Sequence, residues 1–126
     1  MSVLIDTSVW VEHFRRRNDE LVRLIELDMA LTHPMVVAEL ACGTPPAPRT
    51  RTLSDISLLQ TATLASLREV MDFIEREKLY GLGCGIVDMI LLTSTLITPG
   101  ASLWTLDKRL AEISARFNVA HQSRPH

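Results

Sequence analysis

Three observations in the amino-acid sequence predict an α/β fold with a mostly parallel sheet. Short apolar segments of strand length alternate with helical segments, which is the pattern of a three-layer α/β domain. The first apolar segment, residues 3–5, runs directly into Asp6, which would lie beyond the carboxyl end of its strand, where open parallel sheets bind ligands. The chain has 126 residues, of which 47% are hydrophobic and 22% charged, as expected for a single globular domain over residues 1–126.

The N-terminal part is predicted to place two helices between two strands. An amphipathic stretch over residues 9–14 predicts the first helix, with Thr7 or Ser8 as its N-cap. Asn18 is suited to cap the second helix. The inner face of that helix is formed by Leu21, Val22, Leu24, Ile25 and Met29. Residues 30–33 then form a short second strand.

The next helix carries an isolated acid. Pro34 suits its first turn, and Gly43 stops it. Glu39 is the single charged residue in this otherwise apolar segment. A charge in such a helix lies either at the solvent edge or in a buried position with a specific purpose. The Pro-rich residues 44–52 are predicted to form an exposed connector.

Two helices, over residues 53–60 and 66–78, are predicted to pack together as a hairpin. Ser66 and Glu69 have the spacing of a capping box. The buried stripe of the second helix is predicted to contain Leu67, Val70, Met71 and Ile74. Residues 80–85 are rich in glycine, but no strand precedes them, so a flexible connection is favoured over a phosphate-binding loop.

The last third begins with the most apolar helix. Residues 86–97 are apolar almost all round, which predicts a central helix. Asp88 lies in its first turn, where the helix dipole favours a carboxylate for structural reasons alone. A strand over residues 102–105, a further helix and a short strand over residues 117–120 complete the domain, and residues 121–126 are expected to be a loose tail.

Composition sets few limits on function. The net charge of -2 does not indicate a nucleic-acid-binding protein, although most cationic residues are arginines. Cys42 and Cys84 lack the spacing of a zinc site and are expected to be reduced thiols of a cytoplasmic protein. No signal peptide is expected at the N-terminus, and no apolar run is long enough to cross a membrane.

Four acids lie in near-apolar settings: Asp6, Glu39, Asp88 and Asp107. If they converge at one edge of the sheet, they repel one another, by roughly 4 kcal/mol for a pair about 4 Å apart at an effective dielectric constant near 20. Either some are protonated or a divalent cation holds them, and oxygen ligands favour Mg²⁺ or Mn²⁺. The chemistry this suggests is metal-assisted attack of water on a phosphodiester, with Thr7, Ser8 and Thr105 near enough in sequence to orient ligands or water.

These acids, in this order, resemble those of the PIN-domain ribonucleases, and among them the VapC-type toxins of toxin–antitoxin pairs. The resemblance rests on Asp6-Thr7-Ser8, on Glu39 within residues 36–40, on Asp88 after Gly85, and on Thr105-Leu106-Asp107, and it covers about residues 2–120. It implies a PIN-like three-layer α/β/α sandwich and Mg²⁺- or Mn²⁺-dependent cleavage of RNA. It also implies that Asp6, Glu39, Asp88 and Asp107 hold the metal, that Thr105 assists, and that the protein is a homodimer blocked by a cognate antitoxin.

Two other functions are compatible with parts of the pattern. A haloacid-dehalogenase-like phosphatase uses an aspartate after its first strand, but it requires a second aspartate where this chain has Ser8. A PIN-like fold could also bind RNA or a partner protein without catalysis. Lys108 and Arg109 follow Asp107 and either contact substrate phosphates or face solvent.

Overall fold

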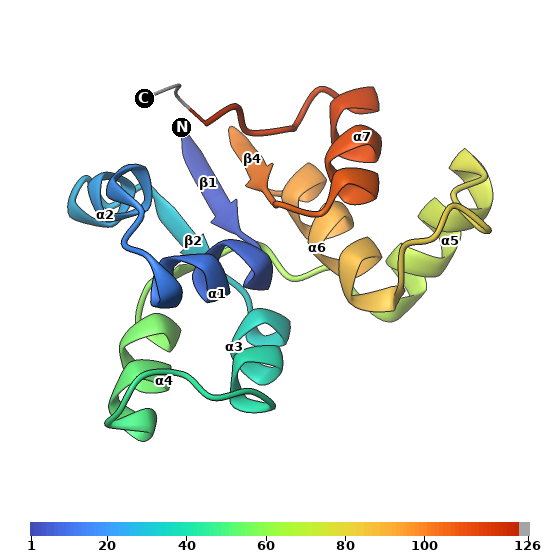
Figure 1. Cartoon of the computed structure of the whole chain (residues 1–126). Helices are drawn as coiled ribbons and strands as arrows, with labels where there is room; N and C mark the ends of the chain where they lie inside the picture. The colour runs from blue at the N-terminus through green and yellow to red at the C-terminus, as the bar shows by residue number, and fades with distance from the viewer. Residues whose placement is uncertain (124–126) are drawn as a thin grey trace.

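The protein has a parallel four-stranded sheet at its centre. In the computed structural model, which describes residues 1–123, the strands are β1 (Ser2–Ile5), β2 (Ala30–Thr32), β3 (Gln60–Thr61) and β4 (Ala101–Trp104). Their order across the sheet is β3-β2-β1-β4, and every neighbouring pair is parallel (Figure 1). The predicted α/β class with a mostly parallel sheet is confirmed.

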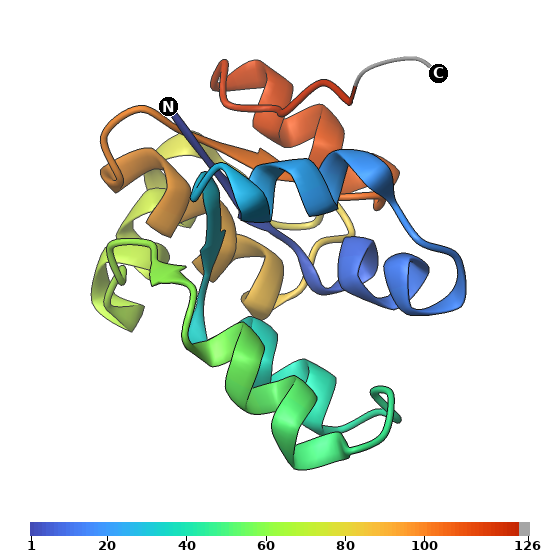
Figure 2. The ribbon, with the colours of Figure 1, turned by 90° about the vertical axis from the view of Figure 1, so that its left-hand side faces the viewer.

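Helices connect the strands and cover the sheet. They are α1 (Thr7–Arg15), α2 (Asp19–Glu26), α3 (Pro34–Ala41), α4 (Arg49–Ser57), α5 (Leu67–Glu77), α6 (Ile86–Ile97) and α7 (Lys108–Arg116). Figures 1 and 2 show α1 and α2 on one side of the sheet and α5 and α6 on the other. The chain leaves β1 towards β2 and β3 but later returns to the opposite side of β1 as β4. The edge between β1 and β4 is therefore the topological switch point, where open parallel sheets bind ligands.

The core is formed by β1 and α6 in the middle of the molecule. Leu4 and Ile5 are fully buried, and the α6 residues 89–95 are buried without interruption. Three of those residues are polar, and their hydroxyls are satisfied: Thr93 and Thr95 donate to carbonyls four residues earlier in the helix, and Ser94 bonds to His33. The prediction of a central helix over residues 86–97 is confirmed.

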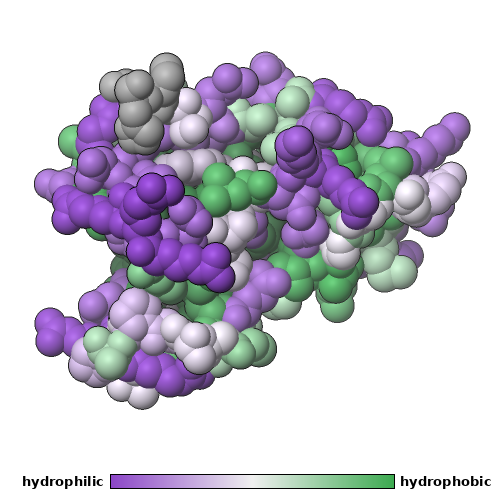
Figure 3. Space-filling model, viewed as in Figure 1, coloured by the Kyte–Doolittle hydropathy of each residue, from purple (hydrophilic) through white to green (hydrophobic). Residues whose placement is uncertain are grey.

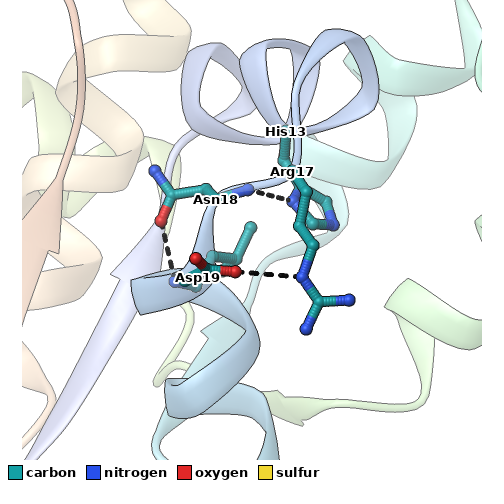
Figure 4. A network of polar contacts seen from close by, with 5 residues as sticks. His13, Arg17, Asn18 and Asp19 are labelled. Carbon is teal, nitrogen blue, oxygen red and sulfur yellow. Dashed lines mark hydrogen bonds and ion pairs between the residues drawn. The ribbon is translucent and has the colours of Figure 1, made fainter.

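The turn between α1 and α2 is fixed by side chains from both helices (Figure 4). The backbone N–H of Asn18 donates to Nδ1 of His13 over 3.0 Å, and Oδ1 of Asn18 accepts from the N–H of Leu21 over 2.9 Å. Asn18 is thus the N-cap of α2, as predicted. Arg17 pairs with Asp19 across the turn, at 3.0 Å. This part of the arginine run at the end of α1 therefore has a structural partner.

His33 links β2, α3 and α6 through both of its ring nitrogens. Nδ1 accepts from the N–H of Met35 as the N-cap bond of α3, so Nε2 carries the proton and donates to Oγ of Ser94 at 3.1 Å. Burial lowers the pKa of His33 below its ordinary value of 6.5. The neutral ring is the form that this part of the core requires.

We expect acid to destabilise the protein through His33. The unfolded chain binds the His33 proton more readily than the folded chain, so this contribution to stability is complete above about pH 6.5 and is lost as the pH falls further. In His33→Asn the amide oxygen can keep the N-cap bond without titrating. Urea denaturation at about pH 7.5 and about pH 5.5 should show a larger loss of unfolding free energy in the wild type than in His33→Asn. Equal losses in the two proteins would exclude His33 as the group responsible.

Several predicted elements differ from the structure. Asp6, rather than Thr7 or Ser8, is the N-cap residue of α1, because both hydroxyls are used elsewhere. The connector is shorter than residues 44–52, since α4 already begins at Arg49. Residues 117–120 do not form a strand: the residue pair Leu103 and Ala120 makes a single bridge.

The predicted hairpin of α4 and α5 is wrong. Strand β3 separates the two helices, so α4 packs on α3 while α5 packs on α6. The stripe predicted on α5 is also partly wrong, because Val70 is buried while Leu67 and Met71 are 61% and 60% exposed. The capping box of Ser66 and Glu69 is confirmed by both of its hydrogen bonds.

Two further predictions concern the ends and the membrane. The tail over residues 121–126 lies partly outside the described residues, but within them the N–H of His121 donates to the carbonyl of Leu103 at 2.9 Å. Among residues 1–123, none of the helices has the length and apolarity needed to cross a membrane.

Candidate active site

Asp6 and Thr105 are brought together by the register of β1 and β4. Ile5 pairs with Trp104, so the residues that follow the two strands lie side by side at the carboxyl edge of the sheet. The backbone N–H of Asp6 donates to the carbonyl of Trp104 over 2.9 Å and extends the ladder by one residue. The parallel pairing of the two strands therefore builds the centre of the site.

The carboxylate of Asp6 is held by two hydroxyls. Ser8 donates to Oδ2 of Asp6 at 2.6 Å, and Thr105 donates to the same oxygen at 2.8 Å. Ser8 in turn accepts from the backbone N–H of Leu106 at 3.0 Å, which ties α1 to the end of β4. Asp6 is only 6% exposed. Within residues 1–123, Oδ1 of Asp6 accepts no hydrogen bond, so this oxygen is left for a ligand.

Glu39 joins the site from α3. The hydroxyl of Thr7, in the first turn of α1, donates to Oε1 of Glu39 at 2.6 Å. The side chain is exposed, so Glu39 lies at the solvent edge of α3 and faces the start of α1. Of the two alternatives that the sequence left open for Glu39, the structure shows the solvent-edge position, and the charge there is bonded to Thr7.

Asp88 and Asp107 each lie at the start of a helix. Oδ2 of Asp88 accepts from the N–H of Gly85 at 3.4 Å in the first turn of α6. Oδ1 of Asp107 accepts from the N–H of Leu110 at 3.0 Å as the N-cap of α7. The structural role suggested for Asp88 is therefore present, and Asp107 has the same kind of role. One oxygen of each carboxylate makes no such bond within the described residues.

Asp6, Asp107 and Glu39 each lie within electrostatic range of Asp88. Burial raises the pKa of Asp88, the hydrogen bond from Gly85 opposes this, and the negative charges of Asp6, Asp107 and Glu39 raise the pKa further. Three other acids therefore disfavour the ionised form of Asp88. The structure brings together the four acids that the sequence singled out.

The donor set fits a hard divalent cation that keeps part of its water shell. Within residues 1–123, no three His, Cys, Asp or Glu side chains stand close enough together to hold a metal ion by themselves. Mg²⁺ in proteins commonly uses one or two carboxylates and completes its octahedron with water and substrate phosphate. An all-oxygen site with mutually repelling carboxylates and an unbonded oxygen on Asp6 has this character.

Comparison with known proteins identifies the family. A family model described as the PIN domain matches residues 3–116. The chain belongs to the PIN-domain family. It is similar to proteins named Ribonuclease VapC32 from two strains of Mycobacterium tuberculosis, CDC 1551 / Oshkosh and ATCC 25618 / H37Rv. It is 41% identical to each over 118 residues, which is 94% of both chains. The resemblance to PIN domains and to their VapC-type branch is confirmed.

This PIN domain has two further residues beside the acids that the sequence did not single out. Gly83 and Cys84 lie in the loop before α6, and Cys84 is a half-buried free thiol. Burial raises the pKa of Cys84, the charges of Asp88 and Asp107 raise it further, and that of Arg109 lowers it. The glycine run over residues 81–85 was the available signal, but it was interpreted only as a flexible connection.

A hollow of about 510 Å³ opens beside Glu39 between α1 and the segment that follows α3. Its wall is formed by Val11, Phe14, Arg15, Glu39, Leu40, Gly43, Thr44, Pro45 and Pro46. Arg49 fixes one side of it by donating to the carbonyls of Gly43, at 2.9 Å, and Ala41. On the face of the PIN domain seen in Figure 3, green side chains are recessed between purple and paler ones at the left. The hollow is largely apolar and reaches one of the four acids.

Proposed function

We propose that this PIN domain is a metal-dependent endoribonuclease, acting on cytoplasmic RNA as the toxin of a toxin–antitoxin pair. The observation that carries the proposal is Asp6, a buried carboxylate held by Ser8 and Thr105 among acids whose charges raise the pKa of Asp88. Carboxylates that gather at one edge of a sheet repel one another, and a bound divalent cation would offset this repulsion while activating water for phosphodiester hydrolysis. The relatives that carry the name ribonuclease support the same activity.

The residues that would hold Mg²⁺ or Mn²⁺, directly or through bound water, are Asp6, Glu39, Asp88 and Asp107. When bound, such an ion supplies charge that stabilises the phosphodiester transition state and lowers the pKa of bound water. The chain itself supplies orientation. Ser8 and Thr105 both donate to Oδ2 of Asp6 and so orient its carboxylate, and Thr7 donates to Glu39 from the first turn of α1. Thr105 therefore assists as a positioning residue.

The phosphatase alternative loses support from the position of Ser8. A second carboxylate at this position would serve as an acid in phosphatase chemistry, but here a hydroxyl donates to Asp6 and accepts from Leu106. A non-catalytic PIN domain remains the competing function from another class. Cleavage of RNA separates it from the nuclease directly.

The test is cleavage of total cellular RNA by the purified protein freed of any antitoxin. We expect discrete products with Mg²⁺ or Mn²⁺, none with EDTA, and none from Asp6→Asn purified in parallel. Sequencing the new ends would identify the RNA class that is cut. A folded, metal-binding wild-type protein without products on any cellular RNA would instead favour the RNA- or partner-binding function.

The hollow beside Glu39 supports the expected antitoxin. Val11, Phe14 and Leu40 provide apolar surface, while Arg15 and Glu39 provide one charge of each sign. A peptide segment with apolar anchors could lie there and reach the acids. In a complex of toxin and antitoxin, Val11→Glu should weaken binding measured by calorimetry, and unchanged affinity would exclude this surface.

The exposed face of α5 supports the expected homodimer. Leu67 and Met71 lie one turn apart and are 61% and 60% exposed, on a helix whose other face packs on α6. Apolar residues in this arrangement are typical of a covered surface. Sedimentation should show a dimer for the wild type and a monomer for Met71→Glu, and two dimers would place the interface elsewhere.

A further inference from the structure

We propose that Arg109 binds a phosphate of the RNA substrate beside the four acids, and that Gly83 is the seat that fixes its position. The inference rests on the proposed function in taking RNA as the ligand. It goes further because the proposed metal site consists of acids alone, and Arg109 would add a cationic residue that contacts the RNA. It also gives a purpose to a glycine in the loop before α6.

The contact between Gly83 and Arg109 leaves no room for a side chain on the glycine. A Cβ atom at Gly83 would lie 2.6 Å from Nη1, 2.9 Å from Cδ and 3.0 Å from Cζ of Arg109. The guanidinium and the adjoining methylene therefore rest directly on the glycine backbone. Gly83 also has a φ of +89°, so the loop conformation itself favours glycine.

The seat places Arg109 next to the acids. Arg109 lies in the first turn of α7, two residues after Asp107. Its charge and the charges of Asp88 and Asp107 all act on the thiol of Cys84, the residue that follows Gly83. The guanidinium and two of the four carboxylates are therefore within electrostatic range of a single side chain.

Arg109 has no competing partner in the fold. Its side chain is exposed, and within residues 1–123 it makes no hydrogen bond or ion pair. By contrast, Arg17 pairs with Asp19 and Arg49 donates to two carbonyls. The side chain of Arg109 thus lies against Gly83, and its donors remain available to a ligand.

Phosphate is the ligand that this arrangement favours. Four carboxylates repel an approaching phosphodiester, and a cation beside them offsets part of that repulsion. A guanidinium presents parallel N–H donors that match two phosphate oxygens, which an ammonium group does not. Lys108 lies next in sequence and is also exposed, but it lacks the glycine seat. The structure therefore distinguishes between two residues that the sequence treated alike.

The test measures binding of a fluorescent, short, mixed-sequence single-stranded RNA to uncleaving Asp6→Asn protein with Mg²⁺, over a range of salt. Adding Arg109→Gln should weaken binding roughly 10-fold, the value of a charge-assisted hydrogen bond. It should also make the slope of log K against log[salt] shallower by roughly 0.7, the loss of one phosphate contact on a single strand. Arg109→Lys should recover part of the affinity, and the matched control Lys108→Gln should change neither quantity to this extent. Equal effects of Arg109→Gln and Lys108→Gln would overturn the proposal.

A second pair of variants tests the seat without removing the charge. Gly83→Ala displaces Arg109, whereas Gly81→Ala introduces similar backbone strain, at a φ of +73°, with nothing within 4 Å of the new Cβ. We expect both to lower the Tm by similar amounts and only Gly83→Ala to weaken RNA binding. If the two bind RNA alike, Gly83 has no such role. The binding assay does not depend on cleavage, so the two proposals can fail separately. If RNA is not cleaved but its binding depends on Arg109, only the nuclease function is rejected. If RNA is cleaved but its binding does not depend on Arg109, only the role of Arg109 is rejected.

Discussion

Asp6→Asn should reduce the rate of RNA cleavage at least about 100-fold while leaving the fold intact. The substitution removes the charge of the most buried acid, whose Oδ1 is left free by the two hydroxyls that bind Oδ2. Asparagine has the same shape, and its amide oxygen can still accept from Ser8 and Thr105. The measurement is the initial rate of product formation with saturating Mg²⁺ or Mn²⁺, together with the thermal unfolding curve.

A matched substitution outside the site shows whether cleavage depends on the charge of Asp6 in particular or on the loss of any acidic charge. Asp55 is exposed on α4, and within residues 1–123 its carboxylate makes no hydrogen bond or ion pair. Asp55→Asn should therefore retain wild-type cleavage. Metal-dependent cleavage by Asp6→Asn at the wild-type rate would remove Asp6 from the site, and loss of activity in both variants would indicate a nonspecific effect of charge.

The sequence predicts this fold best where one signal is strong and local. Residues 3–5 are a short continuous apolar run and residues 86–97 are apolar almost all round, and both are core elements at the predicted places. Strand β3 was missed because Gln60 and Thr61 are polar and exposed, so its existence depends on the edge of β2 rather than on its own residues. Without β3 in the prediction, two helices that pack on different partners were expected to pack on each other.

The site was predictable as a set of residues but not as a set of contacts. An acid at the end of a parallel strand is predicted to lie at the ligand-binding edge, and this singles out Asp6, directly after its strand, and Asp107, two residues beyond the end of another. The partner of each hydroxyl depends on the register of β1 with β4 and on the position of α3, and these are tertiary facts. Ser8 therefore makes more contacts than its position in the sequence predicts, and the spacing of Gly83 and Arg109 does not predict their contact.

Leu92→Ala should lower the free energy of unfolding by about 3 kcal/mol, within the range for leucine truncation in a core. Leu92 is 0% exposed in α6, the helix that packs on both β4 and α5. Its removal leaves a cavity that rigid neighbours on several sides cannot fill. Urea denaturation should show a lower midpoint with an unchanged slope. Since small domains have only about 5–15 kcal/mol of stability, the variant should be close to unfolding on mild heating.

Ile97→Ala in the same helix is the control for the loss of unfolding free energy expected in Leu92→Ala. Ile97 is the last residue of α6 and is 37% exposed, so its truncation should cost clearly less, about 1 kcal/mol or below. Similar losses for the two variants would mean that α6 is not packed as a central helix. Asp88 lies one turn before Leu92, so a loose α6 would also move one of the four acids. Cleavage by folded Leu92→Ala, measured well below its Tm, therefore reports whether the position of Asp88 depends on the packing of the core.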